Sequence, residues 1–115
     1  MTDNAADAVR EITPEQAREL LNADESVILL DVREPEEIAI AAITGSLNIP
    51  TGEIPARLYE LQEHDGATIL TLCHVGFRSL NVAHFLAQHG FEDLASIAGG
   101  IDAWSRTVDP TIPRY

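Results

Sequence analysis

Residues 67–79, which read ATILTLCHVGFRS, give the clearest indication of how this chain folds. Its apolar first part, Ala67 to Leu72, predicts a buried strand. The residues from Ser79 onward have the apolar spacing of a helix. The only cysteine, Cys73, lies between the two, where the unpaired N–H groups and positive dipole end of a helix N-terminus favour a thiolate. The stretch therefore predicts a strand–helix unit that carries a reactive cysteine.

The loop that follows the cysteine has the composition of an anion-binding turn. Gly76 lies in its middle and can adopt a positive φ, which turns successive N–H groups inward around the sulfur. Arg78 adds a planar cation suited to an oxyanion. A lone cysteine is more often a packing residue, but the glycine, the arginine and the strand-to-helix position together favour a nucleophile. We expect it to act on an anionic or sulfur-bearing substrate.

Elsewhere the chain alternates between strand and helix patterns. Thr13 and Gln16 form a capping box around Pro14, which marks a helix start. Apolar patterns predict strands at 9–12, 27–30, 47–50, 67–72 and 94–97, and helices at 14–22, 34–41, 54–62, 79–89 and 101–105. This alternation predicts the α/β class, with a parallel sheet and helices on both of its faces. Ligands of such sheets bind beyond the carboxyl ends of the strands, where Asp31 and Cys73 fall.

Length and charge limit the classes of function. A chain of 115 residues fits one domain, which we place at residues 9–107, with a flexible segment at 1–8 and an irregular tail at 108–115. The net charge of −12 disfavours nucleic acids and anionic membranes as partners, and the absence of lysine excludes lysine Schiff-base chemistry. A single cysteine makes no internal disulfide, and the acidic start is unlike a secretory signal, so we expect a reducing cytoplasm.

The acidic residues are unevenly distributed. None of the 19 lies between Ala67 and Phe91, the window that contains the cysteine loop. One interpretation is that a core strand and a packed helix carry few charges. The other is that the loop has a local field that tolerates an anion on an otherwise negative protein.

Charged residues outside the loop have two interpretations each. Asp31 and Arg33 either orient the rim of the site or form an ion pair with each other or with nearby charges, and we favour the pair. The segment from Glu34 to Glu37 has the composition of a solvated helix start. His64, His84 and His89 lack metal-ligand spacing, so we expect no metal and no cofactor.

Four segments together resemble the rhodanese family of sulfurtransferases. The resemblance covers residues 11–105, and its segments stand in the family's order: LLDVREPEE at 29–37, ITGSLNIP at 43–50, CHVGFRS at 73–79, and GF at 90–91 with AGGIDAW at 98–104. The chain departs from the family at Ala41 and Ala42, where a Gly-His pair is usual, and we expect a change of packing there. His74 is also a less usual choice after the nucleophile; it either tunes the thiolate or faces solvent.

The resemblance implies a fold, a chemistry and a set of site residues. The fold is a five-stranded parallel sheet flanked by helices. Cys73 would attack the outer sulfur of a donor such as thiosulfate and become a persulfide, and cyanide or a thiol would then accept the sulfur. The N–H groups of the loop would stabilise the developing charge, and Arg78 would hold the loop or contact the donor's sulfonate. The implied substrate-binding residues are His74, Val75, Gly76, Phe77, Arg78 and Ser79, with Asp31 and Arg33 in support.

Two other functions remain open. Cysteine phosphatases and arsenate reductases usually place five residues between Cys and Arg, whereas four lie between Cys73 and Arg78, and a shorter ring suits sulfur better than phosphate. A non-enzymatic module could instead carry persulfide sulfur to a protein partner or bind that partner. We expect a monomer, because no oversized apolar stripe is evident.

Overall fold

The computed structural model describes residues 9–64 and 66–115, so the predicted flexible segment 1–8 lies outside the described residues. The described chain forms a five-stranded sheet in the order β1-β5-β4-β2-β3, with parallel pairing throughout. The fold class predicted from the sequence is thereby confirmed. The strands are β1 (Val9–Ile12), β2 (Ile28–Asp31), β3 (Leu47–Asn48), β4 (Ile69–Leu72) and β5 (Leu94–Ile97).

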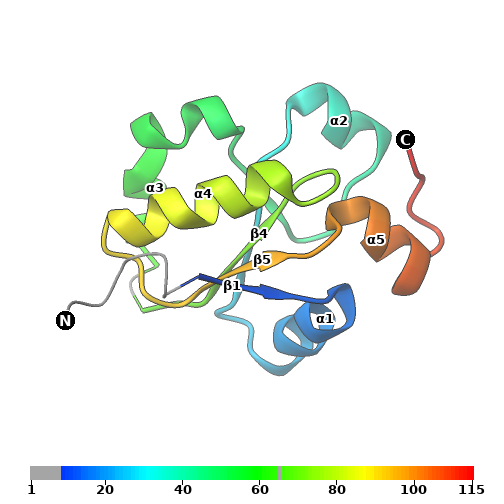
Figure 1. Ribbon diagram of the computed structural model, residues 1–115, viewed down its shortest axis with the longest axis horizontal. Helices are drawn as coiled ribbons and strands as arrows, with labels where there is room; N and C mark the ends of the chain where they lie inside the picture. The colour runs from blue at the N-terminus through cyan, green and yellow to red at the C-terminus, as the bar shows by residue number, and fades with distance from the viewer. Residues whose placement is uncertain (1–8, 65) are drawn as a thin grey trace.

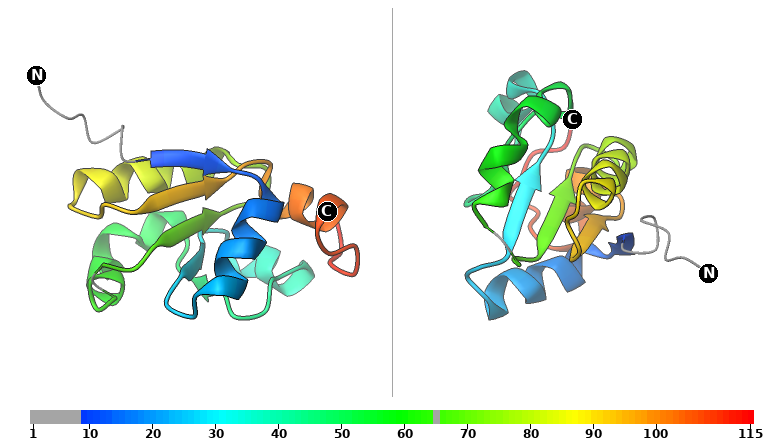
Figure 2. Two further views of the ribbon diagram at one scale, coloured as in Figure 1. Left: turned by 90° about the horizontal axis from the view of Figure 1, so that it is seen from below. Right: turned by 90° about the vertical axis from the view of Figure 1, so that its left-hand side faces the viewer.

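Helices cover both faces of the sheet (Figures 1 and 2). The α-helices are α1 (Pro14–Ala23), α2 (Pro35–Ile40), α3 (Leu58–Gln62), α4 (Phe77–Gln88) and α5 (Gly100–Thr107). On one face, α1 and α5 pack over the alternate strand residues Leu70, Leu72, Ala95 and Ile97. On the other, α3 and α4 pack over Ile69, Cys73 and Leu94. Each inner strand therefore faces a core on both sides, which explains its nearly continuous apolar sequence.

The strand order creates a switch point between β2 and β4. From β2 the chain continues outward to β3, whereas from β4 it continues in the opposite direction to β5. The loops that leave the carboxyl ends of these two neighbours therefore diverge, and the crevice between them is where open α/β sheets bind ligands. Cys73 follows β4 and Asp31 ends β2, so the topology brings both to this crevice.

Local sequence explains where the helices begin. The predicted capping box is present at α1: Thr13 Oγ1 accepts from the Gln16 N–H at 3.1 Å, and Gln16 Oε1 accepts from the Thr13 N–H at 2.9 Å. The helix predicted at 54–62 is instead divided into a 3₁₀ turn, η3 (Pro55–Arg57), and α3, and a further 3₁₀ turn, η2 (Thr51–Glu53), precedes it. Pro55 has no N–H to donate and interrupts the ladder there.

The C-terminal residues 108–115 fold back over the domain. Ile112 is buried in the core beneath α5, and Ser105 Oγ donates to its carbonyl oxygen. The segment has no regular secondary structure, and it returns the chain to the cysteine loop, where Tyr115 stacks on His74. No helix within residues 9–64 and 66–115 is both long and apolar enough to cross a membrane.

Candidate active site

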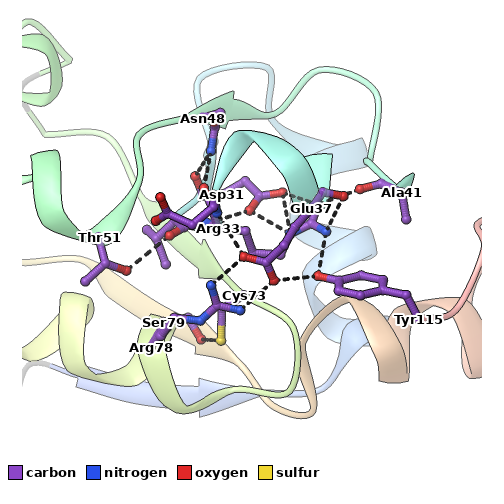
Figure 3. A network of polar contacts seen from close by, with 12 residues as sticks. Asp31, Arg33, Glu37, Ala41, Asn48, Thr51, Cys73, Arg78, Ser79 and Tyr115 are labelled. Carbon is purple, nitrogen blue, oxygen red and sulfur yellow. Dashed lines mark hydrogen bonds and ion pairs between the residues drawn. The ribbon is translucent and has the colours of Figure 1, made fainter. Parts of the chain in front are cut away.

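Cys73 lies directly after β4 and beneath the loop that leads into α4 (Figure 3). The Gly76 N–H donates to its Sγ at 3.1 Å, and the thiol donates to Ser79 Oγ at 3.4 Å. Cys73 is only 1% exposed. The loop above it reaches the surface, since Val75 is 47% and Phe77 77% exposed. The sulfur thus lies just under the surface, with polar groups around it.

The backbone of the loop has the conformation expected of Gly76. Its φ is +112°, and it caps the N-terminus of α4, which begins two residues earlier than predicted, at Phe77. A side chain at this position would be strained by the positive φ. Several inward N–H groups were expected around the sulfur; among the described residues, the Gly76 N–H is the one that hydrogen-bonds it.

The start of α5 holds the other side of the loop. The N–H groups of Ile101 and Asp102 donate to the carbonyl oxygens of Cys73 and His74 at 2.8 and 3.1 Å. A Cβ atom on Gly100 would overlap these two carbonyl groups. Glycine is therefore needed where α5 approaches the loop, and the helix N-terminus fixes the direction of the loop peptides.

Arg78 is held by a carboxylate from α2 (Figure 3). Its Nη1 and Nη2 donate to Glu37 Oε2 and Oε1 at 2.7 and 2.8 Å. The hydrogen bonds from Arg78 lower the pKa of Glu37 to about 2, and the same bonds raise the pKa of Arg78. The interpretation of Glu37 as part of a solvated helix start was therefore wrong. Although residues 67–91 contain no Asp or Glu, the site still has a carboxylate, because α2 supplies Glu37.

Asp31 and Arg33 pair with each other, as the sequence analysis favoured. Arg33 Nη2 donates to Asp31 Oδ2 at 2.7 Å and Arg33 Nε to Oδ1 at 3.0 Å, and both side chains are fully buried. Arg33 Nη2 also donates to the Ala41 carbonyl at 2.7 Å. Ala41, one of the two departures from the rhodanese pattern, is buried and contributes its backbone to this cluster.

Tyr115 connects the buried pair to the loop, and sequence reasoning missed it. Its hydroxyl accepts from Arg33 Nη1 at 2.9 Å and donates to Glu37 Oε1 at 2.9 Å. Its ring stacks on His74, with centroids 4.0 Å apart, and His74 Nε2 donates to its carbonyl oxygen at 2.8 Å. Burial raises the pKa of the Tyr115 hydroxyl. No local signal in the tail identifies this tyrosine, because its partners are 41 or more residues away.

The remaining histidines lie apart from the loop. His89 Nδ1 is 2.8 Å from the Phe85 carbonyl, near the end of α4. Within the part of the chain that the structure describes, no group of three or more His, Cys, Asp or Glu side chains could hold a metal ion.

Known proteins are similar to this chain in fold and in sequence. Residues 13–107 match the rhodanese-like domain family. The chain is 34% identical over 106 residues to the thiosulfate sulfurtransferase GlpE of Haemophilus influenzae, a match that covers 92% of this chain and 97% of GlpE. YrkF of Bacillus subtilis, whose name describes a sulfur carrier protein, is 37% identical over 100 residues, which cover 87% of this chain and 53% of YrkF. The structure of a rhodanese-related protein from Thermoplasma volcanium matches with a TM-score of 0.78 and 28% identity, over 92% of this chain and 99% of that one.

A parallel sheet with helices on both faces and a functional loop at its switch point places this chain among the open α/β proteins, which bind ligands beyond the carboxyl ends of their strands. The chain belongs to one family of this class, the rhodanese-like domains. It spans about half the length of YrkF and about a quarter of two longer relatives in maize.

Proposed function

We propose that this protein is a sulfurtransferase that carries sulfane sulfur as a persulfide on Cys73. The observation that carries the proposal is the polar setting of the one thiol: its Sγ accepts the Gly76 N–H and contacts Ser79 Oγ at the switch point of the sheet. A thiol that only filled core volume would need neither contact. The names of GlpE and YrkF, one a sulfurtransferase and one a sulfur carrier, support the same chemistry.

The proposed reaction has two displacement steps. The Cys73 thiolate attacks the outer sulfur of thiosulfate; a new S–S bond forms, the S–S bond of thiosulfate breaks, and sulfite leaves with the bonding pair. Cyanide or a thiolate then attacks the outer sulfur of the persulfide and restores the Cys73 thiolate as the leaving group. The Gly76 N–H and the loop backbone would stabilise the charge on sulfur in both steps. A reducing cytoplasm, which preserves the free thiol between turnovers, fits this cycle.

Turnover measurements test the proposal. We expect thiocyanate to form from thiosulfate and cyanide at a rate proportional to the concentration of this protein, and no hydrolysis of an aryl phosphate. Phosphate release without thiocyanate would instead assign the protein to the cysteine phosphatases, the function that the four-residue spacing of the loop disfavours.

A sulfur carrier is the second candidate, and the name of YrkF favours it. A carrier would show negligible turnover with thiosulfate and cyanide, yet would accept sulfur on Cys73 from a cysteine desulfurase. Incubation with a desulfurase and cysteine, followed by persulfide labelling, separates this function from the first.

Arg78 is proposed to position the loop and not to bind the donor. Its two terminal nitrogens are already bound to Glu37, so its charge is largely neutralised. We expect Arg78→Ala and Glu37→Gln each to lower kcat/KM by about tenfold, because each breaks the ion pair that holds the loop. The loss should be similar for thiosulfate and for an uncharged persulfide donor. If instead kcat/KM falls only in Arg78→Ala, and only with thiosulfate as the donor, Arg78 contacts the sulfonate of the donor.

The ion pair of Glu37 also predicts a pH dependence of stability. The carboxyl has a pKa of about 2 in the folded protein, against an ordinary value of 4.5. The contribution of this ion pair to the free energy of unfolding is therefore complete above pH 4.5 and is lost as the pH falls towards 2. Since Arg78 is partly exposed, we expect the pair to contribute only about 1 kcal/mol.

Urea unfolding between pH 6 and pH 2.5 checks this dependence. The difference in unfolding free energy between the wild type and Glu37→Gln should shrink as the pH falls, while other acidic groups affect both proteins equally. A constant difference over this range would contradict the assignment.

A further inference from the structure

Ser96 is a buried polar residue that the proposed reaction does not yet use. It lies within β5, in the otherwise apolar strand Leu94-Ala95-Ser96-Ile97, and is 0% exposed. Its register partner on β4 is Thr71, so both hydroxyl side chains lie on the face of the sheet that α4 covers. A hydroxyl in such a position is unfavourable unless it is hydrogen-bonded.

The hydroxyl of Ser96 has one hydrogen-bond partner in the described structure, the hydroxyl of Ser79 at 2.9 Å. Ser79 is also 0% exposed, and its Oγ lies 3.4 Å from the sulfur of Cys73. The Ser96 hydroxyl, the Ser79 hydroxyl and the Cys73 sulfur thus form a continuous row of hydrogen bonds from the centre of the sheet to the sulfur. Both hydroxyls are fully buried, and the polar group that contacts this side of the sulfur is the Ser79 hydroxyl.

The direction of the hydrogen bonds follows from the acceptors present. The proton of Ser96 has one acceptor in reach, Ser79 Oγ, so Ser96 donates to Ser79. The proton of Ser79 is then free for one of two acceptors: the Gly76 carbonyl at 3.3 Å or the sulfur. When Cys73 is a thiol, it donates to Ser79, and Ser79 donates to Gly76.

When Cys73 loses its proton, the hydrogen bond between its sulfur and the Ser79 hydroxyl reverses direction. Ser79 turns its proton from the Gly76 carbonyl to the sulfur anion, and Ser96 continues to donate to Ser79. The Gly76 carbonyl keeps the N–H of Leu80, at 3.3 Å, as its donor, so no buried group is left unpaired. The thiolate then accepts two hydrogen bonds, from the Gly76 N–H above and from Ser79 below.

We infer that Ser96 is a positioning residue for the reactive sulfur: it fixes the Ser79 hydroxyl so that Ser79 donates to the Cys73 thiolate. The inference depends on the proposed function only in that Cys73 works as a thiolate. Ser96 lies outside the cysteine loop, and it reaches the sulfur only because β5 is the neighbour of β4.

Alkylation of Cys73 by iodoacetamide across a range of pH tests the inference without any sulfur donor. Because the chain has one cysteine, the rate reports this thiolate alone. Ser96→Ala should move the midpoint of the profile upwards by about 0.5 to 1 pH unit, which is threefold to tenfold less thiolate below the midpoint. Ser96→Thr, which keeps the hydroxyl, should retain the midpoint of the wild type.

Thr71→Val is the matched control. Thr71 is equally buried on the neighbouring strand, and its hydroxyl donates to the Ser79 carbonyl at 2.8 Å, not to the Ser79 hydroxyl. It should lower stability without moving the midpoint. If Ser96→Ala does not fold, as judged by circular dichroism, the comparison is made between Ser96→Thr and Ser96→Val, which have the same shape.

Two results would overturn the inference: a midpoint that the loss of the hydroxyl at position 96 leaves unchanged, or an equal movement in Thr71→Val. Failure of the proposed function gives a different result. In that case the protein takes no sulfur from thiosulfate or a desulfurase, while the alkylation midpoint still depends on Ser96.

Discussion

Replacing the nucleophile, Cys73→Ser, is expected to lower sulfur transfer by at least about 10³-fold, because a hydroxyl is a far weaker nucleophile than a thiolate at neutral pH. The fold should survive. A serine is slightly smaller than cysteine, and its oxygen can take the place of Sγ between the Gly76 N–H and the Ser79 hydroxyl. We expect the free energy of unfolding to change by no more than about 1 kcal/mol.

The thiocyanate assay and urea unfolding, performed on the same preparation, check both parts of this prediction. Retention of more than about a tenth of the activity would remove Cys73 from the mechanism. If Cys73→Ser loses both its activity and its folded state, the role of the thiol is tested with Cys73→Ala, which also lacks the sulfur.

Removing the guanidinium of the buried pair, Arg33→Ala, is expected to have the largest effect on stability. It leaves the Asp31 carboxylate, which is 0% exposed, without a counterion, and it removes the donors to the Ala41 carbonyl and the Tyr115 hydroxyl. Breaking a buried pair from one side costs about 3–5 kcal/mol, a large part of the roughly 5–15 kcal/mol that stabilises a domain.

An exposed pair in the same protein serves as the control. Arg10 and Asp93 are 3.0 Å apart, with about half of each side chain exposed, so Arg10→Ala should cost less than about 1 kcal/mol. Urea unfolding of the two variants at pH 7 gives the comparison. Equal costs would mean that Asp31 and Arg33 contribute to the fold no more than a surface pair does.

The strands were predictable because their signal is local. Short apolar runs bounded by loop residues identified β2, β4 and β5, and their alternation with helices identified a parallel sheet. The capping box at Thr13 was predictable for the same reason, since its two partners are three residues apart. Cys73 could be placed because a strand, a glycine turn and a helix follow one another without a gap.

The partners of the loop were not predictable, because each arrives from a distant segment. Glu37 reaches Arg78 across 41 positions of sequence, and Tyr115 reaches Glu37 across 78. Local composition made Glu37 look like a solvated helix residue, and only the position of α2 at the switch point gives it a partner. Ser96 was missed for a related reason: a serine within a short apolar strand has no local signal that tells which neighbour its hydroxyl will meet.

If the thiol of Cys73 accepts and returns sulfur, as we propose, intact-mass spectrometry will detect the transferred atom on the protein itself. After incubation with thiosulfate, the protein should gain the mass of one sulfur atom, and cyanide should remove it. Cys73→Ser, folded and treated in the same way, should gain nothing. A wild-type protein whose mass stays unchanged with thiosulfate and also with a desulfurase and cysteine would contradict the claim, as would a gain of the same mass in Cys73→Ser.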